Sequence, residues 1–301
     1  MFKKIVVGLD GREGGRDALT LAARLAGDGG ELIATQVFPY DSHPSRAALG
    51  EFAVALREDA QKSLDHELAE AGVDARTMVV GDSSYARGLH HAAEHERADL
   101  IVVGSTHHGP LGRVLVGDVA RGTLHGAPCA VAVASRGLAR EDRGPSTIGV
   151  GFDDSEESRE ALAVAVDLAH DTGARLELLS VIQMPMAMAF PTAYTYEWTD
   201  LAERDRTAVE EQLERVVAEL DVDASASTVS GSAAKELTEL SRRVDLMVVG
   251  SRRWGPARRL LLGSTADHLA GHSACPLLVL PRGEGTGQPG EREPAGVAAD
   301  G

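Results

Sequence analysis

Residues 249–264 read VGSRRWGPARRLLLGS, and residues 103–118 read VGSTHHGPLGRVLVGD. Each stretch begins at the end of a short apolar run and stops where a helix can start. A glycine just past a buried strand lets the backbone turn, and a Gly-Ser pair at a helix start offers amide groups and a hydroxyl to an anion. We therefore interpret both stretches, here called the opening loops, as anion-binding loops, and residues 249–264 as the better formed of the two.

The chain around these loops repeats itself. Residues 5–10 read IVVGLD and residues 148–153 read IGVGFD, so both copies open with an apolar run that ends in aspartate. The opening loops follow at nearly the same distance in each copy, which indicates duplication. We expect the following division of the chain: domain 1 at 1–135, a charged linker at 136–146, domain 2 at 147–282, and a disordered Gly-, Pro- and Glu-rich tail at 283–301.

Strand and helix patterns alternate through both copies. Residues 99–104 are almost pure Val and Ile, as in a strand covered on both faces, whereas residues 45–71 carry an i, i+4 apolar stripe typical of a long amphipathic helix. This alternation predicts an α/β fold of two tandem repeats, each a five-stranded parallel sheet sandwiched by helices in a Rossmann-like arrangement. In the second repeat we expect a helix at 200–220 capped by Thr199, and Ser264 as the N-cap of a helix at 265–273.

Composition excludes several classes of protein. The chain has 301 residues and a net charge of -16, which disfavours nucleic acid as a partner because phosphate backbones bind to a continuous basic surface. No apolar run is long enough to cross a membrane or to form a signal peptide. The two cysteines, Cys129 and Cys275, are too few for a disulfide framework and suit a reducing cytoplasm. We interpret both as small buried residues.

A basic cluster stands out in this acidic chain. The second opening loop carries Arg252, Arg253, Arg258 and Arg259 without an acidic residue. Such local contrast favours a phosphate-bearing ligand. The alternative, a solvated basic loop or arginines paired with acids elsewhere, stays open from the sequence.

The strand-terminal aspartate, the apolar fourth strand and a Gly-x2-Gly-x9-Gly-Ser/Thr loop together resemble the universal stress protein family. The resemblance covers both repeats. It implies a fold similar to the adenine-nucleotide α-hydrolases and a cleft that holds ATP or another adenine nucleotide, with or without Mg²⁺. It also implies that the last strands, residues 130–134 and 277–280, pair the two domains within the chain. Whether two chains associate further as a homodimer stays open from the sequence.

The resemblance assigns roles to the residues of the second repeat. Asp153 is expected at the adenine and ribose side, the Val181 backbone at adenine, and Gly250 and Ser251 near ribose and phosphate; Gly263 and Ser264 are expected to hold the phosphates. Arg253 is expected either to complete the phosphate site or to block it. The matching positions in the first repeat are Asp10, Val37, Gly104, Ser105 and Gly117.

Three departures from the family pattern separate the two copies. Arg253 and His107 replace the second glycine of the motif, and Asp118 stands where Ser or Thr is expected. A carboxylate at Asp118 suits an N-cap, but it competes with phosphate for the same amide donors. We therefore predict that the second repeat binds nucleotide better than the first.

Other functions have weaker support. The loops lack the GK[ST] ending of a Walker A motif and the GxSxG of a nucleophile elbow, so we expect no enzymatic activity. His107-His108 and the i, i+4 pair His91 and His95 lack the further ligands of a metal site. A nucleotide-free interaction scaffold remains the alternative, and a hydrolase or nucleotidyl transferase a third hypothesis.

Overall fold

The computed structural model describes residues 1–40, 50–105, 112–114, 117–183, 195–251, 260 and 262–281. The predicted tail at 283–301, Arg253, His107 and the other three loop arginines lie outside these residues. In the described part of the chain, no helix has both the length and the apolar character needed to cross a membrane.

The first repeat alternates strands and helices. Its elements are β1 (Phe2–Leu9), α1 (Glu13–Leu25), β2 (Ala26–Pro39), α2 (Gly50–Ala71), β3 (Arg76–Asp82), α3 (Tyr85–Glu96), β4 (Leu100–Gly104), α4 (Asp118–Leu124) and β5 (Ala130–Ala134). The second repeat restates them as β6 (Thr147–Gly151), α5 (Glu156–Thr172), β7 (Arg175–Ile182), α6 (Thr195–Glu219), β8 (Ala224–Ser230), α7 (Ala233–Leu240), β9 (Leu246–Gly250), α8 (Ser264–His272) and β10 (Leu277–Leu280).

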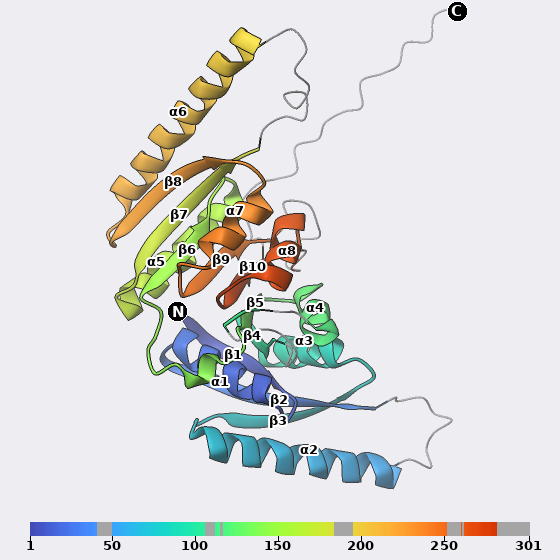
Figure 1. The fold of residues 1–301 in the computed structure, drawn as a ribbon. Coiled ribbons are helices and arrows are strands. Elements are labelled where there is room, and N and C mark those ends of the chain that lie inside the picture. The colour runs from blue at the N-terminus through green and yellow to red at the C-terminus, as the bar shows by residue number, and fades with distance from the viewer. Residues whose placement is uncertain are drawn as a thin grey trace, which may run out of the picture.

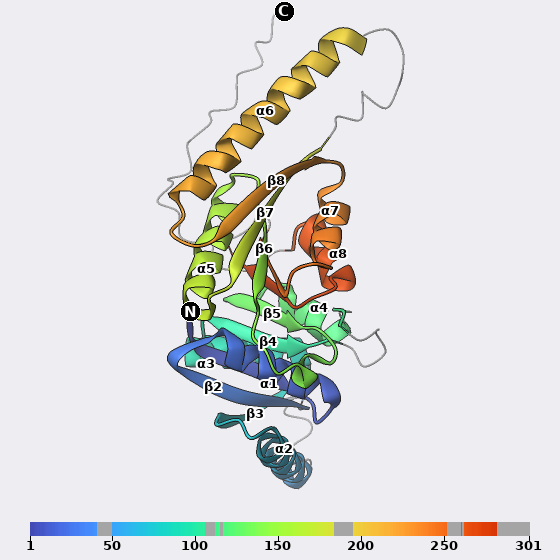
Figure 2. The ribbon, with the colours of Figure 1, turned by 60° about the vertical axis from the view of Figure 1, so that its left-hand side comes forward.

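All ten strands form one sheet, in the order β3-β2-β1-β4-β5-β10-β9-β6-β7-β8. Within each repeat the five strands are parallel, and the repeats join where β5 and β10 run antiparallel, with Ala132 opposite Leu278. The expected pairing of the last strands is therefore present. Figures 1 and 2 show the repeats arranged about this junction, with α2 and α6 at opposite ends of the molecule.

Helices cover both faces of the sheet. One buried cluster lies under α1, α2, α5 and α6 and includes Leu19, Leu64, Leu168 and Leu213; the other lies under α3, α4, α7 and α8 and includes Leu89. Each cluster contains residues of both repeats, because the sheet runs through the junction without a break. The Val- and Ile-rich strands are buried on both faces, as their composition predicted.

The long helix of the second repeat begins earlier than expected. α6 starts at Thr195, so Thr199 lies inside the helix and the prediction that it is the N-cap is wrong. Residues 45–49, where we expected the start of α2, lie outside the described part of the chain. The sequence pattern predicts a helix at 233–243, and in the structure this helix is α7, which ends at Leu240.

The connection between the repeats is anchored to α1. A 3₁₀ helix, η2 (Leu138–Arg140), follows β5 and buries Leu138 against α1. Asp17 of α1 is buried and accepts hydrogen bonds from the backbone amides of Gly137 at 2.8 Å and Ala139 at 2.9 Å. The charged composition of residues 136–146 did not predict this contact, because its acceptor lies in a distant helix.

Candidate functional site

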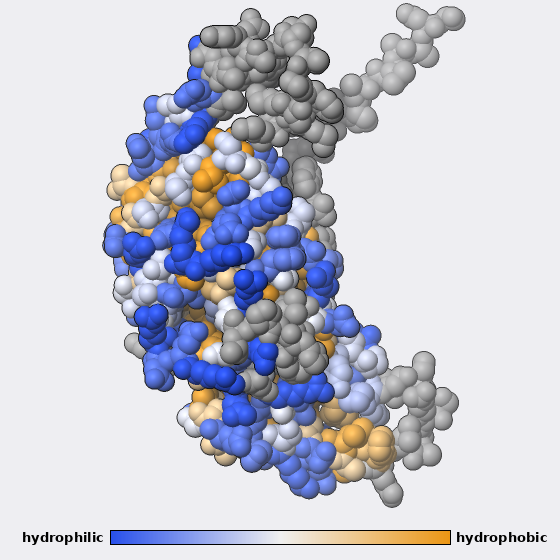
Figure 3. Space-filling model, viewed as in Figure 1, coloured by the Kyte–Doolittle hydropathy of each residue, from blue (hydrophilic) through white to orange (hydrophobic). Residues whose placement is uncertain are grey.

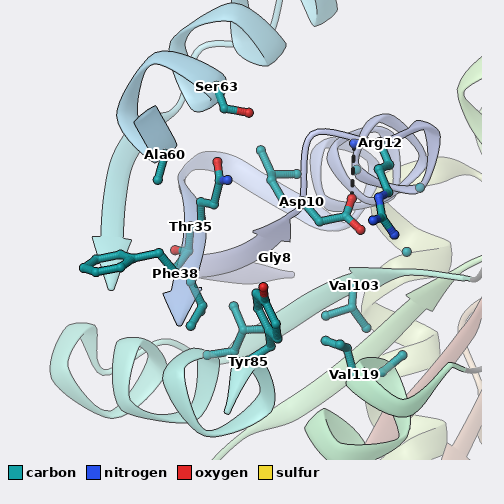
Figure 4. Close-up of a pocket in the computed structure, with 18 of the residues that line it drawn as sticks. Gly8, Asp10, Arg12, Thr35, Phe38, Ala60, Ser63, Tyr85, Val103 and Val119 are labelled. Atoms are coloured by element: carbon teal, nitrogen blue, oxygen red, sulfur yellow. Dashed lines mark hydrogen bonds between the residues drawn. The ribbon is translucent and has the colours of Figure 1, made fainter. Parts of the chain in front are cut away.

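Two clefts open at the carboxyl ends of the parallel strands, one in each repeat. The first has a volume of about 460 Å³ and lies among the ends of β1, β2 and β4 (Figure 4). The second has about 320 Å³ among the ends of β6, β7 and β9. In each repeat the connections leave neighbouring strands toward opposite faces of the sheet here, which is where open α/β sheets bind ligands.

The clefts bring together most of the predicted site residues. Asp10, Val37, Gly104 and Ser105 line the first cleft; Asp153, Val181, Gly250, Ser251, Gly263 and Ser264 line the second. Gly117 does not line the first cleft, where α4 contributes Val119 and Ala120 instead. The role predicted for Arg253 cannot be placed, because this residue lies outside the described part of the chain.

The strand-end aspartates occupy equivalent turns. The Arg12 amide donates to Asp10 Oδ1 at 3.2 Å, and the Ser155 amide donates to Asp153 Oδ1 at the same distance (Figure 4). The residue after each aspartate is left-handed, with φ of 74° at Gly11 and 59° at Asp154. These Asx turns hold each carboxylate at the cleft and lead the chain into α1 or α5.

The glycines that end β4 and β9 are required by packing. A Cβ added to Gly250 would lie 2.6 Å from the carbonyl oxygen of Glu157, and one added to Gly104 would meet the backbone of Gly14 in the same way. The fourth strand of each repeat thus passes directly beside the start of the repeat's first helix. This close packing requires glycine at both positions whether or not a ligand binds. Gly104 and Gly250 also line the clefts.

The helix that follows the second opening loop, α8, starts at Ser264, one residue earlier than predicted, whereas α4 starts at Asp118. Gly263 is the N-cap of α8 and Gly117 that of α4, both with extended backbone and no side-chain capping bond. Ser264 and Asp118 are therefore first helical residues, and the prediction that they cap these helices is wrong. Because the caps are glycines, no N-cap side chain occupies the first amides of α8, and Gly263, Ser264 and Thr265 line the second cleft.

Each opening loop is hydrogen-bonded to the other repeat. The Leu260 amide donates to the Ala127 carbonyl at 2.9 Å, and the Gly126 amide donates to the Leu260 carbonyl at 2.9 Å. On the other side, the Val114 amide donates to the Ser273 carbonyl at 2.8 Å. Leu260 and Val114 are both buried, so each opening loop is anchored to the other repeat.

An ion pair joins the helices that follow these loops. Arg121 of α4 contacts Asp267 of α8 at 3.0 Å. Asp267 therefore pairs across the junction between the two repeats, which the sequence did not indicate.

The histidines on α3 do not converge on one point. His91 Nδ1 lies 3.2 Å from Asp82, whereas His95 Nδ1 lies 3.3 Å from Glu96. Within the described residues no cluster of three or more His, Cys, Asp or Glu side chains is placed to hold a metal ion. Burial raises the pKa of both Cys129 and Cys275 to about 12, so these thiols stay protonated at neutral pH.

The sequence analysis missed the contribution of α2 to the first cleft. Asp59 and Ser63 of α2 line it, as do Gln36 of β2 and Tyr85 at the start of α3. The strand-end residues of the cleft can be predicted from the sequence, because ligands bind at the carboxyl ends of parallel strands. Which turn of a long helix reaches that edge depends on how the helix crosses the sheet, and the sequence does not specify this crossing.

Comparison with known proteins agrees with this architecture. A model of the universal stress protein family matches residues 1–135 and 145–281. A universal stress protein of Mycolicibacterium smegmatis is 31% identical over 230 residues, which cover 74% of each chain. One of Mycobacterium tuberculosis is 30% identical over 197 residues, 60% of this chain and 61% of the relative, so the match spans about three fifths of that protein.

A solved structure that covers most of the chain shows the same fold. A universal stress protein from Archaeoglobus fulgidus covers 93% of this chain and 99% of its own, with a TM-score of 0.67 at 19% identity. A universal stress protein solved in complex with cAMP covers 45% of this chain at 23% identity, with a TM-score of 0.33. With its family model matched once in each repeat and its sheet built from two equivalent halves, the chain belongs to the universal stress protein family as a tandem member.

Proposed function

We propose that this chain is a regulatory module that binds an adenine nucleotide, ATP foremost, in its second cleft. The observation that carries the proposal is the meeting of Asp153, Val181 and the glycine-capped start of α8 in one cleft at the edge of a parallel sheet. A strand-end carboxylate suits ribose hydroxyls, and unoccupied amides at a helix start suit phosphate.

The roles of the residues follow from their places. Asp153 accepts hydrogen bonds from ribose, the backbone of Val181 faces the base, and Gly263, Ser264 and Thr265 supply amides and hydroxyls to the phosphates. In the sequence, Gly263 follows a segment with four arginines and no acid, a composition that favours a phosphate-bearing ligand. Mg²⁺ would enter with the phosphates, and Asp153 and Glu157 are the carboxylates that line this cleft.

Calorimetric titration of ATP into the full chain tests the proposal. Ser264→Asp places a carboxylate at the start of α8, and we expect it to weaken binding at least tenfold because the carboxylate and the phosphates compete for the same donors. Asp118→Ser, the matched change in the first repeat, should leave this binding intact. Loss of ATP binding in Asp118→Ser alone would contradict the assignment of the site to the second cleft.

We further propose that nucleotide binding occurs without appreciable turnover. The sequence supports this, because the opening loops lack the GK[ST] ending of a Walker A motif and the GxSxG of a nucleophile elbow. ADP release from ATP, followed over hours in wild type and Ser264→Ala, measures this directly. Turnover that disappears in Ser264→Ala would favour a hydrolase instead.

One observation favours a second function, that of an interaction scaffold. Phe52 and Val54 near the start of α2 are 61% and 58% exposed, and apolar atoms gather there in Figure 3. Titration of ATP with detection of Trp254 fluorescence separates the two functions. If ATP changes neither the Trp254 fluorescence nor the heat measured by calorimetry, the interaction scaffold is favoured.

A further inference from the structure

The junction between the two repeats has a pseudo-two-fold axis. Arg121 and Asp267 are 146 residues apart, as are the glycine caps of α4 and α8, so they hold equivalent positions in the two repeats. They also contact each other, with 3.0 Å between the Arg121 guanidinium and the Asp267 carboxylate. A residue that contacts its own equivalent across an interface lies on the symmetry axis of that interface.

The strand pairing places a second pair of equivalent residues on this axis. Ala132 of β5 lies opposite Leu278 of β10 at the middle of the antiparallel ladder, and the two are likewise 146 residues apart. The ladder pairs on either side are exchanged by the same symmetry: Val131 with Val279, and Val133 with Leu277. The axis therefore crosses the ten-stranded sheet between Ala132 and Leu278.

Both pairs on the axis join unlike residues that complement each other. Arg121 and Asp267 differ in charge, and Ala132 and Leu278 differ in size. Ala132 and Leu278 are fully buried and belong to the same core cluster. Directly opposite residues of an antiparallel ladder face the same side of the sheet with about 5 Å between their Cβ atoms, so the leucine fills the space that the alanine leaves.

Pairing of like repeats, first with first or second with second, would lose both complements. A residue on a two-fold axis meets its own copy. Two first repeats joined through β5 would set Ala132 against Ala132 and leave a cavity in a buried layer. Two second repeats joined through β10 would set Leu278 against Leu278 and overpack this layer. Like charges would also meet, Arg121 with Arg121 or Asp267 with Asp267.

The buried pair discriminates more strongly than the charged pair. The Arg121 and Asp267 side chains are 53% and 47% exposed, so water and salt screen their interaction. Ala132 and Leu278 are 0% exposed, and in a close-packed core even a change of one methylene group disturbs the neighbouring side chains. The size of the residues on the axis is therefore the main determinant of which repeats fit together.

We propose that the residues on this axis make each repeat selective for the other, so that the β5–β10 surface accepts the unlike repeat and rejects a like repeat of a second copy of this chain. Each opening loop is hydrogen-bonded to the opposite repeat, so this selectivity gives every ten-stranded sheet one cleft of each kind. The inference goes beyond the proposed function, because it concerns the junction and requires no ligand.

The full chain can carry each like pair at its own junction. Ala132→Leu sets leucine against leucine, Leu278→Ala sets alanine against alanine, and the exchange Ala132→Leu/Leu278→Ala restores an unlike pair in reversed order. We expect the melting temperature to fall by at least about 4 °C in Leu278→Ala and by at least about 2 °C in Ala132→Leu. The exchange should recover at least half of the summed loss, because the axis relates the two positions.

Ala134 and Leu280 provide the matched control. They are the same residue types at equivalent positions of β5 and β10, and both are buried in the same core cluster. The register of the ladder does not place them opposite each other. The exchange Ala134→Leu/Leu280→Ala should therefore lose about the sum of its two single effects. Equal recovery in the control would show that the core tolerates such exchanges anywhere, and it would overturn the selectivity.

Arg121→Asp and Asp267→Arg test the charged pair in the same way. Each should lower the melting temperature by about 1–2 °C at low salt and by less in about 0.5 M NaCl, because salt screens the like charges. The exchange Arg121→Asp/Asp267→Arg should match wild type in both buffers. A loss in the exchange variant equal to the two single losses together would contradict a place on the axis.

The exchange of the buried pair decides the inference. If Ala132→Leu/Leu278→Ala loses as much as its two single variants together, or if neither single variant loses stability, the inference is overturned. If Leu278→Ala does not fold at all, a folded exchange variant, checked by circular dichroism, meets the expectation, and an unfolded one contradicts it.

Discussion

At the scale of single residues, the glycines of the opening loops serve the fold as well as a ligand. Gly250 ends β9 where the backbone of Glu157 crosses it, and Gly104 does the same beside Gly14. A sequence motif therefore marks a close backbone approach that exists before any ligand binds. Ser264 and Asp118 are the first residues of α8 and α4 and do not cap these helices. We therefore expect substitutions at these two positions to affect ligand binding more than the fold.

Gly250→Ala is expected to destabilise the chain by about 1–3 kcal/mol, because the new methyl group overlaps a backbone carbonyl that cannot move independently. Urea unfolding measures the change. Gly271→Ala in α8 is the matched control, since a Cβ there meets nothing within 4 Å and alanine favours a helix by up to ~1 kcal/mol. Equal effects of the two substitutions would contradict the packing role of Gly250.

At the scale of elements, α2 buries a carboxyl group behind the first cleft. Glu67 is only 5% exposed. Burial, together with the negative charges of Asp10 and Glu70, raises the pKa of Glu67 from 4.5 to about 7, although the Gly11 amide and Arg16 act in the opposite direction. The folded chain thus favours the protonated form, and this contribution to stability is present below pH 4.5 and lost as the pH rises through about 7.

Glu67→Gln is expected to raise stability at pH 8 by on the order of 1 kcal/mol and to change it much less at pH 5, because the amide never acquires the buried charge. Thermal melts at the two pH values give the comparison. Glu58→Gln, on an exposed position of the same helix, should leave the melting temperature nearly unchanged in both buffers. A gain for Glu67→Gln that is larger at pH 5 than at pH 8 would be evidence against a raised pKa.

At the scale of the whole molecule, the two repeats share one sheet, and each opening loop is hydrogen-bonded to the other repeat. The Leu260 backbone bonds to Gly126 and Ala127 of the first repeat, and Ser251 and Gly263 on either side of it in the chain line the second cleft. We therefore expect a ligand that contacts Ser251 or Gly263 to affect the hydrogen bonds between Leu260 and the first repeat.

Hydrogen exchange should reveal this contact. ATP bound in the second cleft is expected to slow exchange at the Gly126 amide, because that amide donates to the Leu260 carbonyl. Mass spectrometry of peptides across residues 123–128, with and without ATP, measures the effect, and Ser264→Asp should abolish it. Protection confined to the second repeat would show that the loop contact does not transmit ligand binding.

The sequence by itself determined the repeat, the strands and their order along the chain, since these follow from apolar runs, from helical stripes and from glycines at strand ends. It also determined which residues stand at the carboxyl ends of the strands, so Asp10, Asp153, Val37 and Val181 were found in the clefts as predicted. The local sequence pattern is enough to predict these positions, because parallel strands bring their carboxyl ends to one edge of the sheet.

Tertiary structure decided the rest. It placed Gly117 and Gly263, not Asp118 and Ser264, at the N-caps, because a helix start depends on where the preceding loop is anchored. It directed Asp17 to the connection between the repeats and Asp267 to Arg121 across the junction. It opened one cleft toward α2, because the size of that space is set by side chains that meet only when a distant helix crosses the sheet.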